Sequence, residues 1–297
     1  MTYFLGILFA LLAGIVVYIG VLIQKSVINK HSSDPKFIRS LAKNPIWIMG
    51  LLLQIVIGGL VFYFIAIIFI GPAIVPGLMS VGLIVLALGS VKMLKETLGK
   101  EEIIGILLMI GGVSLLGLSN LSIDVSTFNI LNSGFIFRIV VFTIVVLSLA
   151  ILFEILHRKH EQFKGLLMAI EAGLILSLNT VWASPGTTVV THVIDGIIIN
   201  EEVIFGIIIG IILLCIVAIG ITIGQISLKY GQANILAPLT SVPIQAIPVI
   251  SFFTVFLSTP PNILSIIFML IGFTLIIISS FLLTKRQTKL EKVKKDQ

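Results

Sequence analysis

Cysteine and charge are both scarce in this sequence. Its 297 residues include a single cysteine, Cys215, and only 11% of the residues are charged. A lone cysteine excludes a disulfide framework, a cysteine-based zinc site and an iron–sulfur cluster built from this chain alone. Soluble domains have about 25% charged residues, whereas 58% of this chain is hydrophobic. The composition therefore predicts a protein that crosses a lipid bilayer several times.

The residue patterns of intramembrane enzymes are also missing. The sequence has no His-Glu-x-x-His motif, no pair of aspartates within an apolar run and no Ser/His constellation. We therefore expect no enzymatic activity and no cofactor. We expect the lipid bilayer and a small solute as partners, and no nucleic acid. The sequence leaves open whether the chain forms a homo-oligomer.

Nine apolar runs are long enough to cross the bilayer, which takes about 20 residues in a helix. The sequence thus predicts an all-α fold, with one transmembrane domain over residues 1–284 and a basic tail at 285–297. No basic residue precedes the first run and no cleavage site follows it, so we expect a retained helix there. The runs lie at about 3–24, 46–70, 73–94, 103–119, 133–156, 165–184, 203–228, 234–258 and 263–284.

The basic residues predict the orientation of these helices. Of the 19 Lys and Arg residues, all but Arg138 fall on one side of a nine-helix arrangement. The connections on the other side, around 71–72, 119–132, 185–202 and 259–262, contain neither Lys nor Arg. By the positive-inside rule, the N-terminus lies outside and the C-terminus in the cytoplasm. We expect an integral protein of the plasma membrane.

Two distant stretches have similar spacings of proline and glycine. Nearly the same number of residues separates Pro76 from Gly111 as separates Pro238 from Gly272. The two proline-bearing helices are five spans apart and cross in opposite directions, which predicts an inverted repeat with halves at about 1–131 and 132–284. Secondary transporters often have such repeats and bind substrate at interrupted helices between the halves. The predicted hinge prolines are Pro72, Pro76, Pro238, Pro243 and Pro248.

The turn at 95–100, Lys-Glu-Thr-Leu-Gly-Lys, is followed by Gly105 and Gly111. It resembles the acidic turn that closes each half of the drug/metabolite transporter (EamA-like) superfamily, and Glu96 supplies the acid. The segment 62–81 is similar to the aromatic helix of that superfamily that ends in an Ala-Pro-Ala turn before a proline. The resemblance implies an inverted-repeat fold and a structural role for Glu96.

Three further segments resemble the NIPA-like magnesium transporters, a nine-helix branch of that superfamily. They are 164–186, 223–243 and the long basic first loop that ends in Pro45-Ile46-Trp47. This resemblance implies transport of a divalent cation such as magnesium.

Three positions depart from the pattern of that branch. Gly58-Gly59 stands where the branch has a Gly-Glu pair, Trp182 where it has a lysine, and Ser258-Thr259 where a second-half counterpart of Glu96 is expected. The departures leave the substrate open.

Glu171 is the only carboxylate that the sequence places well inside a span. Because an acid within the bilayer is disfavoured by about 2.5–3.5 kcal/mol on insertion scales, we expect it to face a cavity, as a cation ligand or proton carrier. The alternative is that Glu171 reaches water near the interface or pairs with Lys164. Trp182 shares its helix face, and Asn179 could add an amide to the same cavity.

Other polar residues in the spans have weaker interpretations. Gln225 and Gln245 could bind substrate or only join helices, and Gln245 lies between two prolines that can release backbone carbonyls. Glu154 and Arg158 are spaced to form an ion pair on one helix. His157 and His160 beside them could bind a metal, although a charged helix end explains them more simply.

Together these features predict a secondary transporter that works by alternating access, with a divalent cation such as magnesium as substrate. One alternative is a permease for a small organic solute, such as an amino acid or nucleobase, with or without coupling to protons. A remote alternative is a membrane scaffold that transports nothing.

Overall fold

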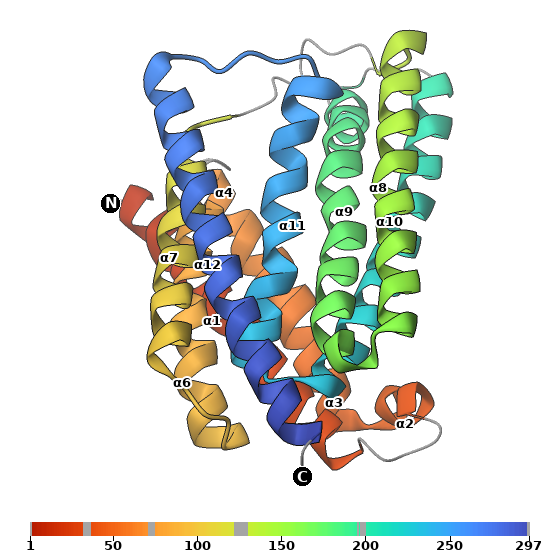
Figure 1. Cartoon of the computed structure of the whole chain (residues 1–297). Coiled ribbons are helices and arrows are strands. Elements are labelled where there is room, and N and C mark those ends of the chain that lie inside the picture. Colours follow the sequence, from red (N-terminus) through yellow and green to blue (C-terminus); the bar gives the residue numbers. More distant parts are fainter. Residues whose placement is uncertain are drawn as a thin grey trace.

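The computed structural model describes residues 2–31, 37–70, 75–121, 130–194, 196 and 200–295. In these ranges the chain forms a bundle of helices, without strands, in which nine helices are long and apolar enough to cross a membrane (Figure 1). The all-α prediction and the nine predicted spans are confirmed. Pro72, one of the predicted hinge residues, lies outside the described residues.

Two of the first four spans consist of more than one helical segment. These spans are α1 (Thr2–Lys30); α3 (Pro45–Leu52), η1 (Leu53–Phe62) and α4 (Tyr63–Ile70); α5 (Val75–Ser80) and α6 (Gly82–Leu94); and α7 (Lys100–Leu118). The short helix α2 (Phe37–Lys43) precedes the second span.

The remaining five spans are longer helices. They are α8 (Ser133–Lys159), α9 (Lys164–Ile194), α10 (Asn200–Tyr230), α11 (Ala233–Thr254) and α12 (Ile263–Lys295), and the 3-10 turn η3 (Glu161–Phe163) leads into α9. Because α12 is helical as far as Lys295, the predicted tail begins as a continuation of the last span.

One end of the bundle, the lower end in Figure 1, carries the basic residues. There α1, α6, α8, α10 and α12 end, and α7, α9 and α11 begin. We call it the basic end. Arg138 lies near the opposite end, where its Nε donates a hydrogen bond to the Val255 carbonyl oxygen at 2.9 Å.

Two spans are irregular near their middle. The second contains η1, a π-helix, a rare conformation that is frequent at functional sites. The third is interrupted at Val81, between α5 and α6. An irregular backbone at membrane depth is tolerated where it is buried in protein or lines a cavity.

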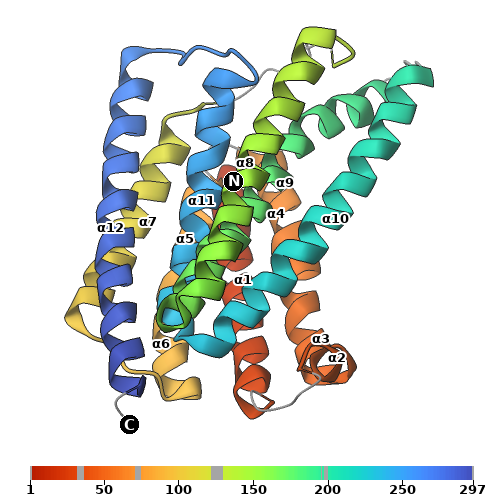
Figure 2. The ribbon, with the colours of Figure 1, turned by 45° about the vertical axis from the view of Figure 1, so that its right-hand side comes forward.

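Glycines bring helix backbones into close contact in three places. A Cβ on Gly14 of α1 would overlap the Met79 carbonyl oxygen of α5, and one on Gly173 of α9 would overlap the Thr240 carbonyl oxygen of α11. Gly112 of α7 and Gly272 of α12 face one another, because a Cβ on either would lie 2.8 Å from the other's carbonyl oxygen. Both views show α7 and α12 side by side (Figures 1 and 2).

The outer surface is strongly apolar. On α10 alone, Ile204, Ile207, Ile211 and Leu214 are exposed. Helices with such a surface suit the hydrocarbon of a lipid bilayer rather than water. The fold is that of an integral membrane protein.

Candidate functional site

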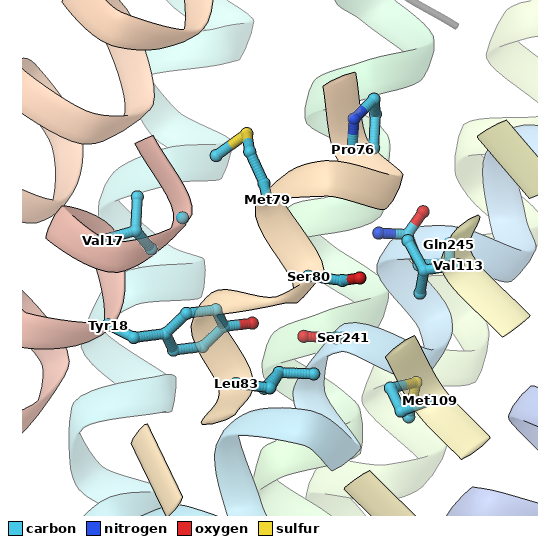
Figure 3. Close-up of a pocket in the computed structure, with 11 residues that line it drawn as sticks. Val17, Tyr18, Pro76, Met79, Ser80, Leu83, Met109, Val113, Ser241 and Gln245 are labelled. Atoms are coloured by element: carbon cyan, nitrogen blue, oxygen red, sulfur yellow. The ribbon is translucent and has the colours of Figure 1, made fainter. Parts of the chain in front are cut away.

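A cavity of about 150 Å³ lies between α1, the interrupted third span, α7 and α11 (Figure 3). Its polar side chains are those of Tyr18, Ser80, Ser241 and Gln245. The hydroxyls of Tyr18 and Ser241 point toward one another. The rest of the lining is Gly14, Val17, Pro76, Met79, Leu83, Met109 and Val113.

A second cavity, of about 220 Å³, lies on the other side of Tyr18, between α1, η1, α9, α10 and α11. Its polar residues include Gln54, Gln225 and Thr240. The two cavities adjoin, since Val17, Tyr18 and Ser241 line both. Among the described residues that line them there is no Asp, Glu, Lys, Arg or His.

A chain of amides closes one side of the second cavity. Gln24 Nε2 donates to Gln54 Oε1 at 2.7 Å, and the amide of Gln225 donates to Gln24 Oε1. Trp47 Nε1 donates to Gln225 Oε1 at 3.2 Å. Gln225 therefore lines the cavity and also joins α10 to α1, so both of its expected roles are compatible with its position. Gln24 is fully buried and bonds to both of the other glutamines, and it was not among the predicted site residues.

Of the predicted hinge prolines that the structure describes, one lines a cavity and three lie inside α11. Pro76 lines the first cavity with Gln245. Pro238, Pro243 and Pro248 lie inside α11, and Pro243 packs against Gly173 of α9. Because proline lacks the backbone N–H, each leaves a helix carbonyl without its usual partner.

Glu171 faces α8 rather than either cavity. Its Oε2 lies 3.1 Å from Nδ1 of His157, and the other ring nitrogen of His157 lies 3.5 Å from Oε2 of Glu154. Trp182 faces the same helix, since its Nε1 donates to Thr143 Oγ1 at 3.0 Å. The shared face predicted for Glu171 and Trp182 is confirmed. Asn179, Glu171 and Trp182 are not among the residues that line the two cavities.

The basic neighbours of this cluster have other partners. Lys164, considered above as a partner for Glu171, lies with its Nζ 4.8 Å from the centre of the Tyr230 ring. Arg158 pairs with Glu154, as their spacing predicts. His160 is exposed.

Glu96 lies at the basic end and caps the N-terminus of α11. Its carboxylate accepts hydrogen bonds from the backbone N–H groups of Ala233, at 2.9 Å, and Asn234, at 3.3 Å, in the first turn of α11. Burial raises the pKa of the Glu96 carboxyl, while these N–H groups act in the opposite direction. The side chain of Asn234 adds a bond to the Thr97 carbonyl oxygen at 3.1 Å. Glu96 therefore joins the loop after α6 to α11.

Comparisons with protein-family models, curated proteins and solved structures found no match to this chain. The resemblance to drug/metabolite transporters stays a prediction from the sequence motifs.

Proposed function

We propose that the chain is a secondary transporter that works by alternating access, with its substrate bound in the two adjoining cavities. The main support is that two adjoining cavities lie beside α1 and α11 and share Tyr18 and Ser241, and that each has hydroxyl and amide groups in an otherwise apolar lining. An interrupted span, α5–α6, and a helix with three internal prolines, α11, border them. Transporter sites are commonly built from such discontinuous helices near the bilayer midplane.

The inverted repeat is part of this proposal, and the packing supports it. In the first half, α1 packs against the second and third spans; in the second half, α9 packs against α10 and α11. The fourth span of each set, α7 and α12, meet one another. We place the halves at about 1–131 and 132–284, and in the second half α8 precedes the four spans α9–α12 and packs on α9.

Helix ends give a second, independent correspondence between the halves. At the end of α6, Lys95 has φ 56° and the N–H of Glu96 bonds to the Ser90 carbonyl oxygen at 3.1 Å. After α11, Leu257 has φ 50° and the N–H of Ser258 bonds to the Phe252 carbonyl oxygen at 3.0 Å. In both turns a non-glycine residue has a positive φ, as is common where a helix ends, and the closing hydrogen bond joins residues six positions apart. Two corresponding helices thus end in the same way.

The charge distribution supports an orientation with the basic end in the cytoplasm. We infer that the C-terminus lies inside and the N-terminus outside, and we propose the plasma membrane as the location.

The lining favours a small organic solute as substrate over magnesium. Mg²⁺ takes oxygen ligands, usually with one or two carboxylates, and keeps several waters. The described lining supplies hydroxyl and amide groups and no carboxylate, and Glu171 faces away from it. Hydroxyls and amides in an apolar cavity suit an uncharged or zwitterionic molecule, such as an amino acid or nucleobase.

Liposomes containing the purified protein test this proposal. We expect uptake of at least one labelled amino acid or nucleobase down its gradient, lost in Ser241→Phe, which fills both cavities. Ser148→Phe is the matched control, because Ser148 is exposed on α8. Uptake of Mg²⁺ alone would overturn the assigned substrate class. No flux of either kind would overturn transport and favour a scaffold.

A further inference from the structure

We propose that Glu154, His157 and Glu171 form a binding site for a divalent transition-metal ion, such as Zn²⁺, between α8 and α9. This site lies apart from the two cavities and does not depend on the proposed transport. One possible ligand atom from each of the three residues lies within 4.8 Å of the other two. Atoms at this separation can converge on one metal ion after small side-chain rotations.

The sequence spacing explains how three ligands meet between two helices. Glu154 and His157 are three residues apart on α8, so both project from one face. Glu171 projects from α9, which packs along that face. A Glu-x-x-His pair on one helix together with a Glu from a facing helix is a ligand arrangement found in metal sites of helical bundles.

Two of the three side chains are buried, so negative charge on the cluster is costly unless a cation compensates it. The side chains of Glu171 and His157 are only 4% and 7% exposed. A buried carboxylate is costly unless it is paired or coordinates a metal. Arg158 pairs with Glu154, but its side chain is 73% exposed and reaches outward. A cation between the two carboxylates would compensate their charge inside the bundle.

The ligand types select the class of ion. Imidazole nitrogen suits Zn²⁺, Fe²⁺ and neighbouring metals, whereas Mg²⁺ prefers oxygen alone. Each ring nitrogen of His157 faces a carboxylate. One ring nitrogen can therefore bind the metal beside a carboxylate oxygen, while the other nitrogen carries the ring hydrogen. The side chain of Glu154 is 33% exposed, so the cluster is open to the outside of the bundle on the Glu154 side.

The site would join α8 to α9, the next span of the chain. Among the described residues, α8 packs mainly against α9 and the short turn η3. A metal held by Glu154 and His157 from α8 and by Glu171 from α9 would fix the position of one helix along the other.

Zinc titration of the full-length protein, without a polyhistidine tag and stripped with a chelator, tests the site. We expect one Zn²⁺ per chain for the unaltered protein. Loss of a ligand should weaken binding at least about tenfold, since even loss of an outer partner of a ligand costs 10–100-fold. We expect this weakening in His157→Gln and Glu171→Gln. His160→Gln is the matched control, an exposed histidine three residues further on.

Three outcomes would overturn the proposal. They are no zinc binding by the unaltered protein, unchanged affinity in both ligand variants, and equal loss in the His160 control. Should the ligand variants fail to fold, X-ray absorption of the zinc-loaded unaltered protein decides. We expect oxygen and nitrogen neighbours with the outer-shell scattering of one imidazole, and a spectrum without imidazole would contradict the site.

Discussion

The carboxylate of Glu96, in the loop after α6, accepts the backbone N–H of Ala233 at the start of α11 with both of its oxygens, each at 2.9 Å. The two residues are 137 positions apart in the chain. A carboxylate at a helix N-terminus satisfies N–H groups that have no partner within the helix and interacts favourably with the helix dipole. This contact therefore ties the loop of one proposed half to a proline-containing helix that lines both cavities.

Removing this cap should destabilise the protein. Glu96→Ala should lower the free energy of unfolding by about 0.5–2 kcal/mol, the usual cost of losing a helix N-cap. Urea or thermal unfolding in detergent, followed by circular dichroism, measures the change. Glu101→Ala is the matched control, because Glu101 pairs with Lys285 on the surface at 3.6 Å, where an ion pair contributes little. Equal losses in the two variants would contradict the capping role.

The raised pKa of Glu96 also predicts a pH dependence. Since burial raises this pKa above its ordinary 4.5, the folded state holds the proton more tightly than the unfolded state. The part of the Glu96 contribution that depends on pH is then fully present below the unfolded-state pKa and is lost as the pH rises through the folded-state pKa. Glu96→Gln cannot titrate, so the stability difference between the unaltered protein and this variant should shift against the unaltered protein as the pH rises from 4. A difference that is constant from pH 4 to pH 8 would contradict the raised pKa.

The buried amide chain should be sensitive to the loss of its central member. Gln24→Leu leaves the side chains of Gln54 and Gln225 without the partner that joins them. We expect a loss of about 1–2 kcal/mol, the range measured for hydrogen bonds between membrane helices in model peptides. Thr222→Val serves as control, since Thr222 is exposed and bonds only within its own helix. Thermal unfolding in the same detergent compares the two variants. Equal melting temperatures would contradict a stabilising role for the hydrogen-bonded amides.

Glycine packing between α7 and α12 makes a size-dependent prediction. A Cβ on Gly112 would lie 2.7 Å from Ile276 Cγ1 and 2.8 Å from the Gly272 carbonyl oxygen, whereas one on Gly210 would meet nothing within 4 Å. Gly112→Ala should destabilise by about 1–3 kcal/mol through overpacking. Gly210→Ala should be neutral or stabilise by about 0.4–1 kcal/mol by restricting the unfolded chain. Unfolding of both variants is the measurement, and a stable Gly112 variant would show that the helices can separate at little cost.

Much of the architecture was predictable because bilayer thickness determines the length of an apolar run. The nine spans follow from that constraint alone, and the i,i+4 pair of Glu154 and Arg158 follows from helix geometry. Helix geometry also placed Glu171 and Trp182 on one face. It cannot say which helix covers that face, and so the contact with His157 on α8 and the position of Lys164 over Tyr230 were not predictable.

Some of the cavity residues were also predictable from the sequence, and others were not. Gln245 and Pro76 were predicted because proline disrupts helix hydrogen bonds wherever it occurs, and they do line the first cavity. Tyr18 and Ser241 carry no sequence signal of that kind, because a tyrosine or serine in an apolar run is equally compatible with packing or lipid contact. Gln24 has a weak sequence signal, because it is an amide within an apolar run. Its hydrogen-bond partners come from two other helices, so the sequence of its own helix does not reveal them.

The position of α8 has a consequence for how the chain can be assembled. Four membrane crossings return a chain to the side on which it started, so two four-helix units joined by a loop would insert facing the same way. In the proposed inverted repeat, the single crossing of α8 gives the unit α9–α12 the opposite orientation to the first four spans. A chain shortened by α8 alone would present α12 to α7 upside down, and the facing pair Gly112 and Gly272 could not form within one molecule.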